Sequence, residues 1–213
     1  MKKKQILKIL FLLLFLLQYR RAKLRAEFNV LDTATLLAFV EKGPLINQEA
    51  NVEGKLKFVT AGVLVEAPVE QIWKIIRDYK NYPKYIKYVK SAEILEQGKR
   101  EDLVKFHLKF TFFTVVRLNV KYIQKNVYKS PNRMDFRMTK GDFEKYYGFW
   151  ETIPVGDKTI LFHGAYPGLR KIWLINFLIS QDPQLEFGIA NSSVTMAAQS
   201  IKEAAEAAYR KRR

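Results

Sequence analysis

Apolar and polar residues alternate along most of the middle of the chain. In residues 102–111 every second residue is apolar, namely Val104, Phe106, Leu108 and Phe110. The same alternation recurs in residues 91–97, 115–128, 133–139, 145–153 and 158–165, with turn sequences between most of the runs. This period of two is typical of antiparallel strands that bury one face and leave the other in water. The region therefore predicts successive strands without intervening helices.

A strand and two short helices are predicted before this region. Residues 57–65 (KFVTAGVLV) are rich in β-branched residues and read as a strand. Pro68 then suits the first turn of a helix, in which Ile72, Trp73, Ile75 and Ile76 form an apolar stripe. Residues 78–81 break this helix, and a shorter one is predicted over residues 82–88.

Three more helices are predicted towards the two ends of the chain. Residues 32–42 begin with Asp32 as a cap and stop at Gly43-Pro44. Residues 169–180 (LRKIWLINFLIS) are apolar on nearly all sides, so a helix there requires burial, a ligand or a membrane. After Pro183, a long final helix is predicted from Gln184 to about Tyr209.

Two stretches carry a resemblance to a known family. VEAPVEQIWKIIRDYKNYPKYIKYVKSAEIL, from residue 65 to residue 95, resembles the entry motif of the START-like superfamily, also called SRPBCC. It is most similar to the polyketide cyclase/dehydrase and coenzyme Q-binding branch. GDFEKYYGFWETIP, from residue 141 to residue 154, resembles a later strand pair of the same branch. The resemblance covers about residues 55–209.

The resemblance implies an α+β helix-grip fold. In that fold a curved antiparallel sheet, here of about seven strands, wraps around a long C-terminal helix, and two short helices follow the first strand. The predicted organisation is a signal peptide or N-terminal membrane anchor (1–26), an N-terminal helical extension (27–54), the START-like domain (55–209) and a basic tail (210–213). The family also implies an apolar cavity between the sheet and the long helix.

The basic charge is concentrated at the ends of the chain. Residues 1–25 contain eight of the basic residues and none of the acidic ones, which is half of the net charge of +16. The body is therefore only mildly basic, and nucleic acid is not an expected partner. A basic start and the apolar run from Ile9 to Leu17 are typical of a signal peptide. Basic residues after that run favour an uncleaved anchor instead, so export to the periplasm and membrane anchoring both remain open.

Composition and motifs exclude several kinds of chemistry. The chain has no cysteine, which excludes disulfides, thiolate metal sites and cysteine nucleophiles. It contains no phosphate-binding loop, dinucleotide fingerprint or nucleophile elbow. The two histidines, His107 and His163, lack metal-site spacing. We therefore expect neither a metal nor a cofactor, and we assign no catalytic residue.

The predicted ligand site is the cavity implied by the family. Its expected lining comes from the strands, the second short helix and the last helix: Trp150, Tyr146, Tyr82, Tyr85, Phe110, Met138, His163 and Met196. The apolar helix is predicted to form a lid that touches a membrane. Arg170 and Lys171 would meet anionic headgroups, while the apolar side chains enter the interface, namely Trp173, Leu174, Phe177 and Leu178.

Three functions remain open. The first is binding, and in some settings transport, of a lipid or an isoprenoid- or quinone-like molecule at or near an anionic membrane. The second is a cyclase/dehydrase-type enzyme that uses the same cavity, for which His163 and Tyr146 are the titratable candidates. The third is a ribosome- or protein-interaction module, which would require a cytoplasmic location.

Overall fold

The computed structural model describes residues 31–112 and 116–211. The chain divides into two compact units, residues 1–36 and 37–213. The proposed signal peptide or anchor lies outside the described residues, as do the last two residues of the basic tail. Asp32 caps the helix α2 (Thr33–Val40), since its carboxylate accepts hydrogen bonds from the backbone N–H and the hydroxyl of Thr35 at 2.9 and 2.8 Å.

The second unit is built on one antiparallel sheet of eight strands in the order β1-β2-β8-β7-β6-β5-β4-β3. Its strands are β1 (Leu45–Ala50), β2 (Leu56–Val65), β3 (Val89–Gln97), β4 (Glu101–Phe112), β5 (Val116–Ser130), β6 (Arg133–Gly141), β7 (Tyr146–Val155) and β8 (Lys158–Pro167). Strands β3 to β8 follow one another in the sequence, each pairs with the next, and the described residues between them contain no helix. This confirms the predicted run of strands without helices.

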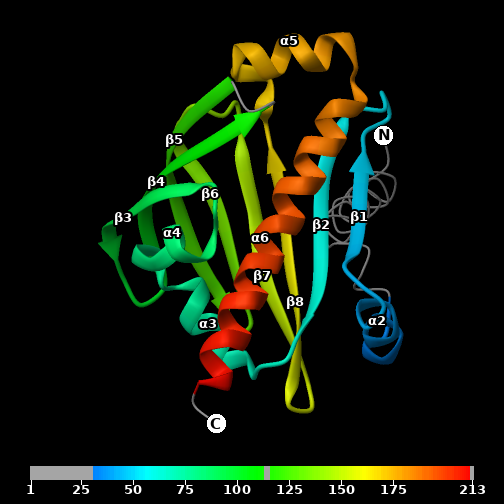
Figure 1. Cartoon of the computed structure of the whole chain (residues 1–213), viewed down its shortest axis with the longest axis vertical. Coiled ribbons are helices and arrows are strands. Elements are labelled where there is room, and N and C mark those ends of the chain that lie inside the picture. Colours follow the sequence, from blue (N-terminus) through cyan, green and yellow to red (C-terminus); the bar gives the residue numbers. More distant parts are fainter. Residues whose placement is uncertain (1–30, 113–115, 212–213) are drawn as a thin grey trace, which may run out of the picture. The chain divides into compact units, whose positions relative to one another are not determined.

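Helices lie on one face and at both ends of this sheet. They are α3 (Val69–Ile76), the 3-10 helix η2 (Tyr79–Asn81), α4 (Tyr82–Tyr85), the 3-10 helix η3 (Leu169–Lys171), α5 (Trp173–Gln181) and α6 (Gln184–Arg210). Figure 1 shows α6 running diagonally across the face that the curved sheet encloses, with α5 at one end and α3 at the other. The predicted α+β helix-grip fold is therefore confirmed.

The strand β1 corrects the prediction that residues 27–54 form a helical extension, and it raises the number of strands from about seven to eight. Its sequence, LINQEA, has half-buried and exposed residues in alternation, and only Leu45 and Ile46 are large and apolar. Local patterning could not reveal such a strand. It forms because β2 offers an edge, to which residues 45–50 pair in antiparallel register.

The opening helices are held by both apolar and polar contacts. Ile72, Ile75 and Ile76 of α3 are buried as predicted, whereas Trp73 is half-buried and its indole N–H donates to the Thr152 hydroxyl at 3.1 Å. The Tyr82 hydroxyl donates to the carbonyl of Ile76 at 2.6 Å. This bond satisfies a carbonyl at the end of α3 that has no partner within the helix.

Gly148 allows β6, β7 and β8 to pack closely. It stands between Phe136 on β6 and Ala165 on β8. A Cβ atom at this position would lie 2.0 Å from the carbonyl oxygen of Gly164 and 2.6 Å from the Phe136 ring. No side chain can fit there without moving the backbone of β8, so the glycine is required by the close approach of the neighbouring strand.

Candidate functional site: an apolar cavity between the sheet and the last helix

An apolar cavity of about 100 Å³ lies between the sheet and α6. Strands β3 to β8 provide most of its wall, α4 and the following residue close one side, and η3 and α5 contribute Leu169, Ile172 and Ile175. From α6 come Ile189, Ser193, Val194 and Ala197. Ligand pockets usually have about 300 to 1,000 Å³. The cavity is smaller than that, so a lipid-sized molecule would require it to widen.

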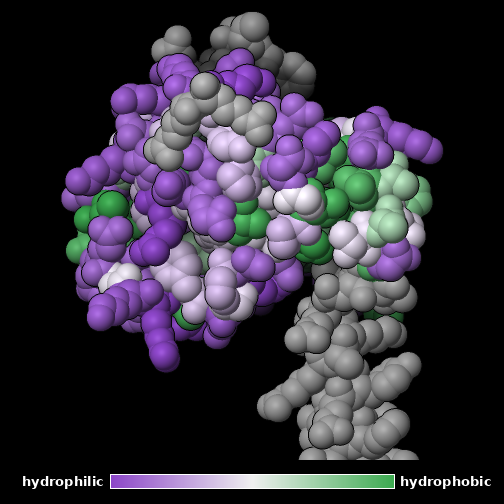
Figure 2. Space-filling view, turned by 90° about the horizontal axis from the view of Figure 1, so that it is seen from below, coloured by the Kyte–Doolittle hydropathy of each residue, from purple (hydrophilic) through white to green (hydrophobic). Residues whose placement is uncertain are grey.

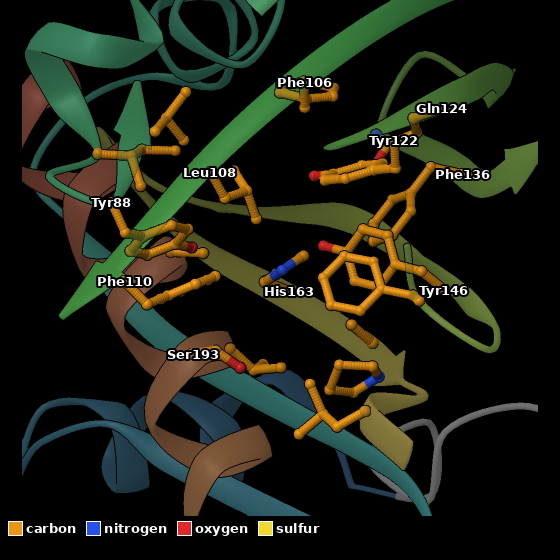
Figure 3. Close-up of a pocket in the computed structure, with 18 of the residues that line it drawn as sticks. Tyr88, Phe106, Leu108, Phe110, Tyr122, Gln124, Phe136, Tyr146, His163 and Ser193 are labelled. Atoms are coloured by element: carbon orange, nitrogen blue, oxygen red, sulfur yellow. The ribbon is translucent and has the colours of Figure 1, made fainter. Parts of the chain in front are cut away.

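Aromatic rings make up much of the wall. The imidazole of His163 stacks on the indole of Trp150, with ring centres 3.9 Å apart and an interplanar angle of 15°. In the view of Figure 3, His163 lies between the rings of Tyr88 and Phe110 on one side and those of Tyr122 and Tyr146 on the other. Flat rings on opposite walls suit a ligand with a planar or apolar body.

His163 is neutral and presents one fixed hydrogen-bond acceptor. Its Nδ1 lies 3.1 Å from the carbonyl oxygen of Phe149, which can only accept, so Nδ1 carries the ring proton. Burial lowers the pKa of His163 from 6.5 to about 4, because desolvation disfavours the imidazolium. At neutral pH the second nitrogen, Nε2, is therefore unprotonated. This tautomer is assigned from the hydrogen bond to the backbone.

Three tyrosine hydroxyls add adaptable polar groups to the cavity. Figure 3 shows the hydroxyls of Tyr122 and Tyr146 directed into the space beside His163, with Tyr88 across from them. The rings of Tyr122 and Tyr146 meet edge to face, with centroids 5.2 Å apart. Burial raises the pKa of all three phenols, so they stay protonated at neutral pH.

The structure brings five of the predicted pocket residues together around this cavity. They are Trp150, Tyr146, Tyr82, Phe110 and His163. Their common feature is inward orientation on the enclosed face of the sheet or on α4. Contact of these residues with a ligand remains a prediction.

The other three predicted residues lie outside the lining, which corrects their assignment. Met196 is 48 % exposed, because it lies on the face of α6 that points away from the sheet. Tyr85 directs its hydroxyl to Asp78, to which it donates at 2.8 Å. Met138 is half-buried opposite Gln124, next to a register shift at which the pairing of β5 and β6 becomes irregular.

The predicted lid residues divide between two faces of η3 and α5. Ile175 is buried against the cavity, whereas Trp173 and Phe177 are 76 % and 56 % exposed, and Leu174 and Leu178 are half-buried. Trp173 and Phe177 lie one turn apart, on the same side of the helix.

The predicted headgroup contact of Arg170 needs correction. Its guanidinium forms an ion pair with the carboxylate of Glu186 at 2.7 Å, and Glu186 is only 3 % exposed. The ammonium of Lys171 donates to the carbonyl of Gly141 at 2.9 Å. Arg170 therefore holds η3 against the start of α6 rather than standing free for a phosphate.

Sequence reasoning missed Tyr88, Tyr122, Gln124 and Ser193 as lining residues. The sequence did contain a signal for Gln124. It follows Val120 and Tyr122 at every second position of β5, so it is expected on the same, inner face of the sheet. A polar residue at a buried strand position requires a partner or a function.

Metal binding and membrane spanning have no support in the described part of the chain. Residues 31–112 and 116–211 contain no group of three or more histidines or carboxylates that could hold a metal ion. Within the same ranges, none of the helices has the length and apolar character needed to cross a bilayer.

Known structures with the same fold include lipid-transfer proteins and cyclases. A STAR-related lipid transfer protein from Xanthomonas axonopodis matches with a TM-score of 0.57 and 15% identity, covering 79% of this chain and 94% of that one. A START superfamily protein from Mycobacterium smegmatis matches with a TM-score of 0.54 and 18% identity, covering 73% of this chain and 99% of that one. The Zhui aromatase/cyclase from Streptomyces sp. R1128 matches with a TM-score of 0.51 and 15% identity, covering 70% and 93%. At this identity the likeness establishes the fold alone.

Comparison of sequences gives the family. No curated protein matches the chain. A family model does match, over residues 65–177, which is more than half of the chain. This confirms the START-like relationship expected from the two motifs. The chain belongs to the family described as polyketide cyclase / dehydrase and lipid transport.

Proposed function

We propose that this protein binds an apolar small molecule, a lipid or an isoprenoid- or quinone-like compound, in the cavity under α6. The observation that carries the proposal is the ring-lined cavity with only a few polar groups. Burial of apolar surface contributes about 25 cal/mol per Å², so such a wall favours an apolar occupant over water. The fold shared with lipid-transfer proteins and cyclases supports the same proposal.

We further propose that the protein works at an anionic membrane surface. α5 supports this, because it buries Ile175 against the cavity and exposes Trp173 and Phe177 on its other side. Entry of these two rings into the lipid interface would move the helix that closes the cavity, and so couple docking to ligand exchange. Export or anchoring through residues 1–26 would bring the domain to that surface.

Filling the cavity from α6 tests the binding proposal. Ser193 lines the cavity, whereas its neighbour Ser192 is exposed. We expect Ser193→Leu to lose most of the apolar material that co-purifies with the native protein, because the added side chain occupies the free volume. Ser192→Leu should retain it. The measurement is native mass spectrometry, followed by solvent extraction and weighing of the bound compound. Equal retention by the two variants would place the ligand elsewhere.

An enzyme of the cyclase/dehydrase type is the second candidate. His163 and Tyr146 both line the cavity, so a titratable pair is available beside any bound molecule. The lowered pKa of His163 makes its Nε2 a weak base at neutral pH. Incubation of the extracted compound with fresh protein separates the two candidates. A binder leaves its mass unchanged, whereas an enzyme converts it to a product of different mass.

A further inference from the structure

A chain of polar side chains leads from the cavity wall to a buried carboxyl group. Gln124, which lines the cavity, donates through Nε2 to Oδ1 of Asn126 at 2.6 Å. Asn126 donates through Nδ2 to the Tyr79 hydroxyl at 3.0 Å. That hydroxyl lies 3.3 Å from Oδ2 of Asp102 and 3.0 Å from the Tyr128 hydroxyl. Gln124, Asn126, Tyr79 and Asp102 are all at most 6 % exposed.

Asp102 sets the direction of the hydrogen bonds that link these side chains. It accepts from the hydroxyls of Tyr79 and Tyr128 and from the backbone N–H of Gly98. Burial raises the pKa of Tyr79 and raises that of Tyr128 to about 12, so both phenols keep their protons. Tyr79 has one hydroxyl proton, which it directs to the side where Asp102 and the Tyr128 hydroxyl lie. Its oxygen can therefore only accept from Asn126.

The hydrogen bonds to Asp102 also fix the orientation of the Asn126 and Gln124 amides, up to the cavity wall. Because Asn126 uses its NH₂ group on Tyr79, it presents its oxygen to Gln124. Gln124 then directs one N–H of its NH₂ group to Asn126, which leaves its oxygen, Oε1, on the side away from Asn126 as an acceptor. Reversing either amide would set two donors or two acceptors against each other in a buried place, which costs about 1 to 3 kcal/mol for each group left without a partner. Gln124 is thus held as an acceptor.

Apart from the hydroxyls of Ser193 and Tyr82, which donate to backbone carbonyls, the cavity has two acceptors of fixed polarity and several hydroxyls of variable polarity. The first acceptor is Oε1 of Gln124, and the second is Nε2 of His163, whose ring proton is held by the Phe149 carbonyl. The hydroxyls of Tyr88, Tyr122 and Tyr146 can rotate to donate or to accept, so they tolerate either kind of ligand group. Discrimination between ligands must come from the fixed groups.

We propose that Gln124 determines ligand specificity, and that with His163 it selects apolar molecules that carry a hydroxyl group over those whose polar groups only accept. This rests on the proposed function of the cavity. Asn126, Tyr79 and Asp102 are positioning residues, since they act through Gln124. A hydroxyl can donate to one of the two acceptors, whereas a ketone or an ether leaves both without a partner.

A matched pair of small probes tests the inference. 4-Propylcyclohexanol and 4-propylcyclohexanone have the same apolar body and differ in the presence of a donor. We expect the native protein to bind the alcohol about tenfold more tightly than the ketone, measured by isothermal titration calorimetry, because buried acceptors that lack a donor weaken binding by roughly that factor.

Variants of the hydrogen-bonded residues Gln124 and Tyr79 sharpen the test. Gln124→Met removes the acceptor and should reduce the alcohol-to-ketone ratio by about threefold or more. Tyr79→Phe keeps the ring but frees both amides to reverse, so it should lower the ratio without weakening the binding of the ketone. A merely structural role would weaken both probes equally. Tyr147→Phe, which removes a hydroxyl from a half-exposed tyrosine outside the lining, is the matched control and should leave the ratio unchanged.

The outcomes separate this inference from the function on which it rests. Equal affinity for alcohol and ketone in the native protein, or a ratio that Gln124→Met leaves unchanged, would overturn the role of Gln124 and leave apolar binding intact. Failure of the folded native protein to bind either probe would count against the cavity as a ligand site, and the inference would fall with it. If Tyr79→Phe does not fold, Gln124→Met still decides the question.

Discussion

His163 and Trp150 lie with their ring planes nearly parallel at the centre of the cavity wall, and both are at most 5 % exposed. The imidazole has a hydrogen-bond partner for Nδ1, but no charged side chain contributes to its pKa shift, which comes from burial. A histidine held neutral in this way links the chemistry of the cavity to the stability of the fold.

The stability of the fold should therefore depend on the protonation of His163. The pKa is about 4 in the folded protein and 6.5 for the unperturbed side chain, so between these values the unfolded chain binds the proton more strongly. The contribution of His163 is complete above pH 6.5 and is lost as the pH falls towards 4. The free energy of unfolding should fall by about 2 to 3 kcal/mol between pH 7 and pH 4.5 from this group alone.

Urea unfolding of two variants isolates this contribution from that of the carboxyl groups. His163→Phe keeps a ring against Trp150 and should lose that part of the pH dependence. His107→Gln should follow the native protein, because His107 lies near the surface and pairs with Asn119. Identical pH dependence in His163→Phe and the native protein would show that His163 titrates normally in the folded state.

At the scale of the element, α5 differs from the other helices in what it leaves exposed. Its buried residues, Ile175 and Ile179, hold it to the domain, while Trp173 and Phe177 project from the other side. The opposite end of the domain, where α3 lies, is mostly hydrophilic in Figure 2. Two large exposed rings on one short helix are typical of an interfacial contact.

Removal of the more exposed ring should weaken membrane binding. We expect Trp173→Ala to reduce partitioning onto vesicles that contain anionic lipid by about tenfold, since insertion of such a side chain is worth about 1.5 to 3 kcal/mol. The measurement is co-sedimentation with vesicles. Met196→Ala removes an apolar side chain that is 48 % exposed on α6 and serves as the control. Binding that is reduced equally in both variants would argue against a specific role of α5.

At the scale of the whole molecule, the net charge of +16 is distributed unevenly, with half of it in residues 1–25. Attraction between such a segment and an anionic surface acts over about 10 Å at 0.1 M salt and weakens as salt is added. The apolar contact proposed for α5 depends much less on salt. The two contributions can therefore be separated by ionic strength.

Vesicle binding by the full chain should fall steeply between about 50 and 300 mM salt, because screening removes the charge contribution. Replacing Arg20, Arg21, Lys23 and Arg25 by Gln should flatten this dependence. Trp173→Ala should lower binding at every salt concentration and leave the slope unchanged. If the fourfold variant keeps the native slope, then the basic segment does not take part in membrane attraction.

Local patterns in the sequence were enough to predict the strands β2 to β8, the helices α3 to α6 and the α+β class. Alternation along a strand and apolar stripes along a helix are properties of near neighbours, so the printed residues contain them. The motifs from residue 65 to residue 95 and around Trp150 then indicated how these elements are arranged. The strand β1 escaped because LINQEA has no such pattern and depends on pairing with β2.

Contacts between residues distant in sequence determined the rest. Met196 and Ser193 are both plausible lining residues on α6, and only the rotation of the helix against the sheet places Ser193 at the cavity and Met196 in water. Arg170 reads as a free cation until the buried carboxylate of Glu186 is found beside it. Likewise, the polarity of Gln124 follows from Asn126, Tyr79 and Asp102, which three separate elements bring together. Hydrogen-bond direction and burial depend on that assembly, and no local pattern encodes them.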